Sequence, residues 1–392
     1  MNSVVKKNTE EWKLISKLAE ERKSWMNKGD GGKSMMPHSI CLALNNYCFM
    51  RCHMCDVGAA IRDKDLKDDM MFFYARQTGG EKAYSLPIED IKNLIDDVAS
   101  FKPIIRANFL EPLLRDDIAE IARYVSQAGL QFYIQTNGYL LPKHAHALLE
   151  AGVRNIRVSV DGPEAVHNDI RGVKDSWKKA MEGLRMVVDW KKRHKVDYPL
   201  VGLSFTLSDL NYDTILDFYR EIADLNLAED IYIAFNHLKY STKAEADEHN
   251  ATHGNHFNLT ETSLSSVDIS KIDADVISQQ FEALDREFPK DIFKRHVNPL
   301  LTKDEMHQWY DGESYLNPET ACYEPWTVAQ IHFDGEVGIN GRCIAPNFGN
   351  IREQKFTDIW NSDAAQDFRR LVRKHPDLPS CNRCNRNFRK QT

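Results

Sequence analysis

Residues 39–55 read SICLALNNYCFMRCHMC, a short apolar run followed by three closely spaced cysteines. These are Cys48, Cys52 and Cys55. An iron-sulfur cube has four irons to ligate, so three thiolates in one loop leave one iron open to a ligand that is not a protein side chain. The same cysteines would also fit half of a zinc site, a fragment of a two-cluster ferredoxin, or buried thiols. The surrounding sequence decides between these interpretations, because a motif is confirmed by its structural context.

The sequence around the cysteines alternates short apolar runs with helical patterns, which is typical of parallel βαβ units. The pattern predicts strands at 40–44, 104–109, 131–136, 155–160, 201–206 and 231–235. It predicts helices at 88–101, 175–192 and 213–225, and another that ends at Gly129. Because the first strand ends just before Cys48, we expect the cysteines at the carboxyl end of the parallel strands, where α/β barrels build their active sites.

The composition of the 392-residue chain is that of a globular protein, with 42% hydrophobic and 28% charged residues. Its formal net charge of -7 argues against a general affinity for nucleic acid or anionic membrane, because such binding needs a basic surface. No apolar run approaches the ~18 residues that span a bilayer, and the amino-terminal residues lack a secretory pattern. We therefore predict a cytoplasmic protein whose clustered cysteines bind metal.

The spacing of Cys48, Cys52 and Cys55 resembles the C-x3-C-x2-C signature of the radical S-adenosylmethionine (radical SAM) superfamily. The resemblance implies an α/β fold with a partial (β/α)6 TIM-like barrel. It also implies a 4Fe-4S cluster whose open iron is chelated by the amino and carboxylate groups of SAM. The reduced cluster would then split SAM into a 5'-deoxyadenosyl radical that abstracts hydrogen from substrate, while the protein binds, orients and excludes water.

Two sequence elements match family positions that meet the adenine and amino group of SAM. Met54, just before the third cysteine, occupies the position whose backbone meets the adenine. The run Phe109-Leu110-Glu111-Pro112 stands where the family has Gly-Gly-Glu-Pro, so the resemblance implies that Glu111 receives the amino group. Both glycines are missing here, which puts a close approach of the backbone in doubt.

Two further elements match family positions that bind the SAM carboxylate. Ser159-Val-Asp161-Gly matches the family's Ser-Leu-Asp-Gly at the end of the fourth predicted strand. Arg171 stands where related enzymes have an arginine. The resemblance implies that Ser159 and Arg171 together bind the carboxylate, with the guanidinium acting as a planar fork.

A second group of cysteines lies near the carboxyl end of the chain: Cys322, Cys343, Cys381 and Cys384. Between the first two, residues 328–339 predict a β-hairpin closed by an Asp334-Gly335 type I' turn, and 363–374 predict a helix. This region resembles the SPASM/Twitch domain, a small α+β cluster-binding domain. The likeness implies that four cysteines fully ligate a second, auxiliary 4Fe-4S cluster. A zinc ribbon remains the alternative, because four thiolates suit zinc equally well.

Together these patterns predict four segments. They are a helical extension over 1–38, the radical SAM core over 39–270, a helical linker over 271–315 and the auxiliary-cluster domain over 316–392. The polar stretch 242–270, which contains His249, His253 and His256, is interpreted as a flexible surface loop, with metal binding by a helix as the alternative. Residues 56–85 are interpreted as a polar insertion that could cover the site.

The substrate is less well defined by the sequence. Residues 1–38 are too few for a leader-recognition domain, which favours a small polar molecule such as a sugar, aminocyclitol or nucleoside over a peptide. His237 is a candidate general base, although a structural histidine is the more common case. Cys41 is a candidate hydrogen-atom donor, although a buried thiol is the usual explanation.

These residues leave two reaction outcomes open. Dehydrogenation would pass an electron to the auxiliary cluster, and epimerisation would return hydrogen from a thiol. A reducing partner such as flavodoxin or ferredoxin is implied in either case. A peptide-modifying SPASM maturase, a multi-cluster electron-transfer protein and a zinc-stabilised binding module remain alternatives.

Overall fold

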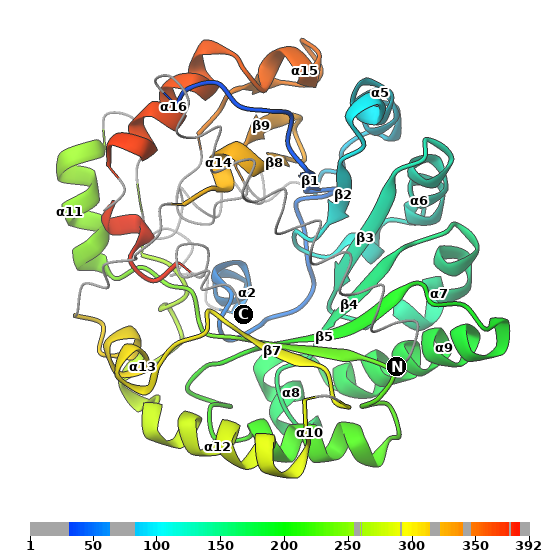
Figure 1. The fold of residues 1–392 in the computed structure, drawn as a ribbon, viewed down its shortest axis with the longest axis vertical. Coiled ribbons are helices and arrows are strands. Elements are labelled where there is room, and N and C mark those ends of the chain that lie inside the picture. Colours follow the sequence, from blue (N-terminus) through cyan, green and yellow to red (C-terminus); the bar gives the residue numbers. More distant parts are fainter. Residues whose placement is uncertain are drawn as a thin grey trace.

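The computed structural model describes residues 31–62, 83–254, 259, 261–290, 292–313, 322–339, 346–375 and 378–384. Within them a single ten-stranded sheet has the order β10-β9-β8-β1-β2-β3-β4-β5-β6-β7. Figure 1 shows the helices as an outer ring around the curved sheet. None of the described helices is both long and apolar enough to cross a membrane.

The centre of the sheet consists of six parallel strands in sequential order. They are β1 (Ser39–Leu42), β2 (Ile104–Ala107), β3 (Gln131–Thr136), β4 (Asn155–Ser159), β5 (Leu200–Thr206) and β6 (Tyr232–Asn236). All six predicted strands are present, with ends that differ by at most two residues. The arrangement confirms the predicted partial (β/α)6 barrel, since sequential parallel strands need a crossover helix between neighbours.

The helices between these strands cover the outside of the sheet (Figure 1). They are α5 (Ile88–Val98), α6 (Ile118–Gln127), α7 (Leu141–Glu150), α8 (Glu164–Arg171), α9 (Ser176–His194) and α10 (Ile215–Asp224). Each has an apolar face that packs in the core; in α5 this face holds Ile91, Leu94, Ile95 and Val98. Gly129 follows α6 with a φ of 74°, as predicted for a glycine that ends a helix. A short helix, α2 (Asp56–Arg62), follows the cysteine loop.

Both edges of the six-stranded core carry additional strands. On one edge β7 (Arg295–Asn298) pairs parallel with β6, and on the other β8 (Val328–Ile331) pairs parallel with β1. The described part of the segment 271–315, predicted as a helical linker, contributes β7 as well as α12 (Ala274–Glu287) and α13 (Lys303–Tyr310). The carboxyl-terminal region shares its sheet with the barrel.

The predicted hairpin in the carboxyl-terminal region is present but its turn differs. β8 pairs antiparallel with β9 (Glu336–Gly338), which pairs with β10 (Gly349–Asn350). Gly335 has a φ of 87°, but Asp334 is not among the residues with positive φ, so the turn is not type I'. The amide of Gly335 donates to the backbone carbonyl of His332, and the amide of His332 donates to the backbone carbonyl of Glu336. This is a three-residue loop with glycine in the left-handed position. Three helices complete the region: α14 (Glu324–Thr327), α15 (Phe356–Ile359) and α16 (Asp363–Lys374).

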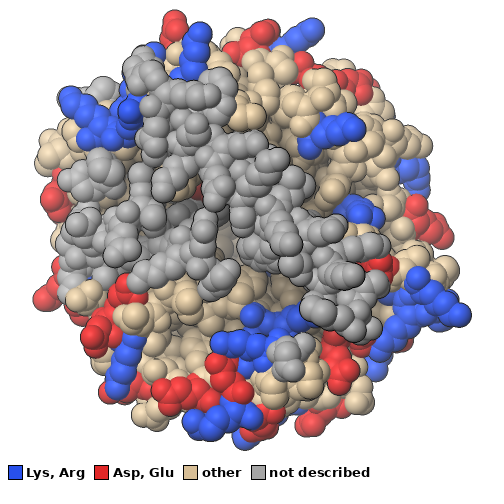
Figure 2. Space-filling view, viewed as in Figure 1, with Lys and Arg blue, Asp and Glu red and all other residues tan. Residues whose placement is uncertain are grey.

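The polar segment predicted as a surface loop is largely helical. Lys243–His253 form α11, which begins with a reciprocal capping box between Thr242 and Glu245. His249 is fully buried in this helix, and its ring centroid lies 5.4 Å from that of His253. The loop interpretation is therefore wrong for these residues, while His256 and most of the predicted 56–85 insertion lie outside the described residues. On the face drawn in Figure 2, the described acidic and basic side chains are intermixed around the rim.

Candidate active site

The loop between β1 and α2 carries the three amino-terminal cysteines. Cys52 is buried, and Cys48 and Cys55 are half-buried. Burial raises the pKa of Cys48 above its ordinary value, and the neighbouring Cys52 raises it further. Burial likewise raises the pKa of Cys52 to about 11. Buried thiols of this kind become thiolates when a metal displaces their protons, so the donor set fits cluster iron better than a free nucleophile.

The backbone of this loop is bound to the carboxyl end of α8. The amide of Arg51 donates to the carbonyl of Arg171 at 3.0 Å, and the amide of His53 donates to that of Ile170 at 2.8 Å. The Arg51 side chain donates from Nη2 to the carbonyl of Gly172 at 2.9 Å. Gly172 ends α8 with a φ of 63°. The cysteine loop and the end of α8 therefore form one hydrogen-bonded unit.

Gly58 allows α2 to pack directly on the cysteine loop. A Cβ at this position would lie 2.5 Å from the backbone nitrogen of Cys52 and 2.6 Å from its carbonyl oxygen, whereas ordinary contact begins near 3.4 Å. No residue with a side chain fits there without moving Cys52. Gly58 was not among the predicted site residues, although a glycine inside a helical run three residues after a motif cysteine is a usable signal.

The guanidinium of Arg171 lies between a carboxylate and a motif cysteine. Its Nη2 is 2.5 Å from Oδ2 of Asp161, and its Nη1 donates to the sulfur of Cys52 at 3.5 Å. Asp161 is fully buried, and its Oδ1 accepts from the amide of Thr206 at 2.9 Å. Burial opposes the positive charge, but Asp161 and Cys52 together raise the pKa of Arg171. The structure thus brings two of the predicted SAM-binding residues against the cysteine loop.

The pairing of Arg171 changes how it can meet a ligand. Both Nη groups already contact protein atoms, whereas Nε is buried and has no hydrogen-bond partner among the described residues. These two contacts use two of the five N–H groups of the guanidinium, so Nε and further Nη hydrogens are left, and binding of the SAM carboxylate by Arg171 remains a prediction. Ser159 is half-buried at the end of β4, and its hydroxyl accepts from Nε2 of Gln135 at 3.4 Å.

Glu111 is fully buried and accepts three hydrogen bonds within the protein. Its Oε1 accepts from the amide of Leu113 at 3.0 Å and from the hydroxyl of Thr136 at 2.7 Å, and its Oε2 accepts from the amide of Asn137 at 2.7 Å. Burial raises the pKa of Glu111, and these donors oppose that rise. Three of the roughly four lone-pair positions of the carboxylate are therefore occupied. Glu111 joins the segments that follow β2 and β3, with one position left for a ligand.

Leu110 stands at the second missing glycine of the family pattern. Its φ is 51°, in the left-handed region that glycine adopts easily and leucine rarely does. Leu110 therefore adopts a backbone conformation that glycine favours. Met54 is 7% exposed and packs in the core, and its predicted contact with adenine remains a prediction.

Two polar contacts not anticipated from the sequence hold the segment after β5 against the site. His53 Nε2 is hydrogen-bonded to Asp209 Oδ1 at 2.9 Å, and Asp209 Oδ2 accepts from the amide of Asp268 at 3.2 Å. Asn211 donates from Nδ2 to the carbonyl of Asp161 at 2.9 Å. The cysteine loop and the Asp161 backbone are therefore both supported from this segment.

The two candidate catalytic residues have different surroundings. His237 is 2% exposed, its Nδ1 is hydrogen-bonded to the hydroxyl of Tyr310 at 2.9 Å, and burial lowers its pKa to about 3. These contacts account for His237 as a structural residue that joins β6 to α13. Cys41 is buried in β1, on the opposite face of the strand from Ile40 and Leu42, which pack in the core beneath the helices. Cys41 therefore belongs to the inner face of the barrel.

Three of the four predicted auxiliary-cluster cysteines lie in the described residues. Cys322 and Cys381 are half-buried and Cys384 is buried, while Cys343 lies outside the described residues. The C-x2-C turn is held by α11 and α13. Asn382 Nδ2 donates to Glu245 at 2.6 Å, and the fully buried Arg383 pairs with the same carboxylate. Arg383 also donates from Nε to a carbonyl at the end of α13 at 2.9 Å.

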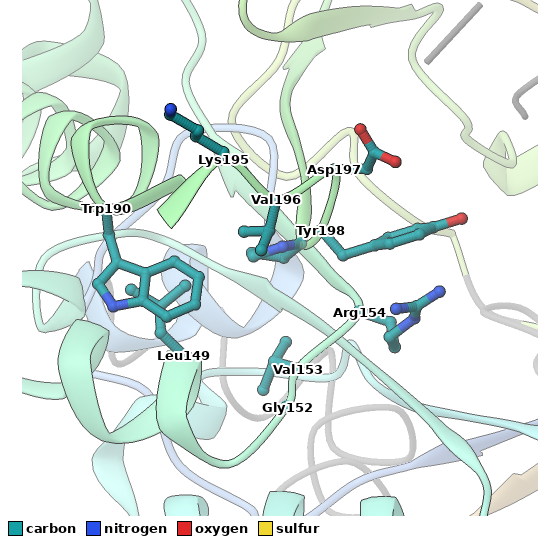
Figure 3. A pocket seen from close by; sticks show the side chains of 10 residues that line it. Leu149, Gly152, Val153, Arg154, Trp190, Lys195, Val196, Asp197 and Tyr198 are labelled. Carbon is teal, nitrogen blue, oxygen red and sulfur yellow. The ribbon is translucent and has the colours of Figure 1, made fainter. Parts of the chain in front are cut away.

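A cavity of about 570 Å3 lies at the other end of the barrel, among the segments that precede β4 and β5. Figure 3 shows Trp190 and Tyr198 on two sides of it. The guanidinium carbon of Arg154 lies 3.3 Å from the centroid of the Tyr198 ring. None of the predicted site residues lines this cavity, and parallel strands put it far from the cysteine loop.

Comparisons with known proteins agree with this geometry. The model of the radical SAM superfamily matches residues 42–222, and the model of the SPASM iron-sulfur cluster-binding domain matches residues 322–385. An AdoMet-dependent heme synthase of Methanosarcina barkeri is 28% identical over 310 residues, which cover 75% of this chain and 78% of that protein. The Fe-coproporphyrin III synthase of the same organism is 28% identical over 339 residues, 81% of this chain and 78% of its own length.

The fold is also found among solved structures. Streptococcus suis SuiB bound to the precursor peptide SuiA superimposes with a TM-score of 0.56 at 13% identity, covering 94% of this chain and 75% of SuiB. The chain therefore belongs to the radical SAM superfamily and carries a carboxyl-terminal SPASM-type domain, so its cofactors are a SAM-binding 4Fe-4S cluster, SAM and an auxiliary cluster.

Proposed function

We propose that this enzyme cleaves SAM reductively beside Cys48, Cys52 and Cys55 and removes a hydrogen atom from an organic substrate held in the barrel. The observation that carries the proposal is the charged contact of Arg171 with Asp161 and the Cys52 sulfur. An electron carrier or a zinc-stabilised module has no need of a buried guanidinium with an open Nε next to a three-cysteine loop.

The residues of the site have separate roles in this proposal. When bound, the cluster and SAM supply an adenosyl radical that abstracts hydrogen. Cys48, Cys52 and Cys55 hold the cluster, and Arg171 balances negative charge at Cys52 and donates from Nε to the SAM carboxylate. Glu111 keeps the segment after β2 in place and offers its remaining lone pair to the SAM amino group. Ser159 donates to the carboxylate from the end of β4.

The proposed substrate is a small organic molecule. Two relatives that align with 75% and 81% of the chain are named for heme and Fe-coproporphyrin III synthesis. This supports a tetrapyrrole as the first substrate class to test. The sugar, aminocyclitol and nucleoside classes expected from the sequence remain part of the proposal as further small substrates. A peptide is the second candidate, which the likeness to SuiB supports at the level of the fold.

The outcome of the reaction depends on the fate of the substrate radical. Loss of an electron to the auxiliary cluster and of a proton to solvent would give dehydrogenation, and a flavodoxin or ferredoxin would supply the separate electron that cleaves SAM. Return of a hydrogen atom from Cys41, which belongs to the inner face of β1, would give epimerisation and leave a thiyl radical, which an electron from the reducing partner and a proton from solvent would restore to the thiol. His237 has no proton-transfer role in this proposal, because it is buried and hydrogen-bonded to Tyr310.

The proposal is tested with anaerobically reconstituted protein, SAM and dithionite. The wild type should form 5'-deoxyadenosine, and Cys52→Ala should form none. Cys41→Ala is the matched control, because it removes a buried thiol outside the cluster loop and should leave SAM cleavage unchanged. Wild-type protein that contains a full complement of iron and yet forms no 5'-deoxyadenosine would overturn the proposal.

A further inference from the structure

The inner face of the barrel carries the alternate residues of each strand. Ile105 on β2 and Ile156 and Val158 on β4 pack in the core beneath the helices. The residues between them therefore point to the opposite face of the sheet, where the strands surround the barrel interior. Arg106 on β2 and Arg157 on β4 both lie at these inward positions.

Each arginine is accompanied by a tyrosine from a neighbouring part of the inner face. The guanidinium carbon of Arg106 lies 5.5 Å from the ring centroid of Tyr133, and that of Arg157 lies 5.3 Å from the ring centroid of Tyr232. Arg157 also donates from Nε to the hydroxyl of Tyr232 at 3.0 Å. These contacts orient both guanidinium groups without neutralising them.

Gly202 makes this arrangement possible on the β4 side. It lies on β5, between the strand of Arg157 and the strand of Tyr232. A Cβ at this position would lie 2.4 Å from the Tyr232 ring, so only glycine lets the ring cross β5 to reach Arg157. The ring of His296 on β7 stacks on the far side of Tyr232, with centroids 6.4 Å apart. Burial lowers the pKa of His296 to about 4, which leaves the guanidinium groups as the charges here near neutral pH.

The strands around the two arginines lack acidic groups that would balance these charges. No inward position of β1 to β8 carries Asp or Glu, and neither arginine has an ion pair among the described residues. Glu336 on β9 lies on the inner face but is three strands away from Arg106. Two buried polar atoms on this face, Arg106 Nε and Gln330 Oε1, also have no hydrogen-bond partner among the described residues, and neither does Asn108 Oδ1 just after β2. Unpartnered buried polar atoms are unusual and costly, so a group that binds them is expected.

We propose that Arg106 and Arg157 bind an oxyanion of the substrate, a carboxylate or a phosphate, inside the barrel. The strands place this oxyanion deeper than the SAM site, since Arg157 precedes Ser159 by two residues, or about 7 Å. The two arginines lie two strands apart, or roughly 10 Å, so they can hold two groups of one molecule. The inference rests on the proposed function, and names the chemical class of its substrate.

The test measures binding of coproporphyrin III, a tetracarboxylate, to the holoenzyme by fluorescence. Arg106→Gln and Arg157→Gln should each weaken binding about tenfold or more, because each removes charge-assisted hydrogen bonds. Arg193→Gln, an exposed arginine on α9, is the matched control and should bind as the wild type does. The tetramethyl ester, which has no carboxylate, should bind equally to all four proteins.

A second arm distinguishes the two sources of oxyanion. Inorganic phosphate is tested for protection of Arg106 and Arg157 from modification by phenylglyoxal. Protection by phosphate, in a protein that does not bind the tetracarboxylate, would support the site and assign it to a phosphorylated substrate. If both arginine variants bound coproporphyrin III with wild-type affinity, the inference would be overturned. It would also be overturned if the wild type did not bind coproporphyrin III and phosphate did not protect the arginines. Formation of 5'-deoxyadenosine without substrate should persist in both variants, so failure of this inference is distinguishable from failure of the proposed function.

Discussion

Replacing Gly58 by alanine should remove the SAM-binding cluster while leaving the fold and the auxiliary cluster in place. The new Cβ would lie 2.5 Å from the Cys52 nitrogen, so it must move about 0.9 Å to reach ordinary contact near 3.4 Å. Overpacking of this kind costs about 1–3 kcal/mol, which a barrel of this size survives. Metal-ligand distances tolerate only about 0.2 Å, so the displaced Cys52 no longer meets the cluster.

The assay is the iron and sulfide content of anaerobically reconstituted Gly58→Ala, together with SAM cleavage. Iron should fall by about four atoms per chain, and formation of 5'-deoxyadenosine should be lost. Ile61→Ala is the matched control in the same helix, because Ile61 is 39% exposed and its truncation leaves the Cys52 backbone untouched. Full iron content and wild-type SAM cleavage in Gly58→Ala would refute the reasoning that α2 positions the cysteine loop.

Substitutions at three further positions test other features of the protein. Burial holds the pKa of His237 at about 3 in the folded protein, whereas in the unfolded chain it is about 6.5. As the pH falls through 6.5, His237 is protonated in the unfolded chain but not in the folded protein, so the folded protein loses stability. The unfolding free energy, measured in urea, should therefore fall by about 1 kcal/mol less between pH 7 and pH 5.5 in His237→Gln than in the wild type. The same dependence of unfolding free energy on pH in both proteins would contradict this. Arg383→Gln leaves Glu245 without its buried partner, which should cost about 3–5 kcal/mol and empty the auxiliary site. Retention of both clusters, by iron analysis, would show that this ion pair does not support the site. Leu110→Val should melt below Leu110→Asn, because asparagine tolerates a φ of 51° better than a β-branched residue does, and equal melting temperatures would argue against backbone strain.

Local patterns were enough to predict the central fold. β3 begins and ends where the apolar alternation predicted, and α16 has the predicted bounds. The polar helix α11 was missed because it has few apolar residues, although its Thr242 and Glu245 capping box was visible in the sequence. The pairing of β8 with β1 joins residues almost 300 positions apart, which no local pattern encodes.

The candidate site was predicted in part. The motif identified Asp161 and Arg171, but not that they pair with each other, because that contact depends on how α8 packs against β4. Gly58 was missed because its role depends on the closeness of the Cys52 backbone, which only the structure reveals. The charge of the inner face was missed for a similar reason, since Arg106 and Arg157 lie on separate strands and come to face the same barrel interior only in the curved sheet.

The central claim is that SAM binds to the open iron of the cluster held by Cys48, Cys52 and Cys55. Electron paramagnetic resonance of the dithionite-reduced protein tests it most directly, before and after SAM is added. We expect a changed spectrum in the wild type and in a Cys381→Ala, Cys384→Ala variant that lacks two of the four predicted auxiliary-cluster ligands. A reduced cluster signal that SAM leaves unchanged in both proteins would contradict the account.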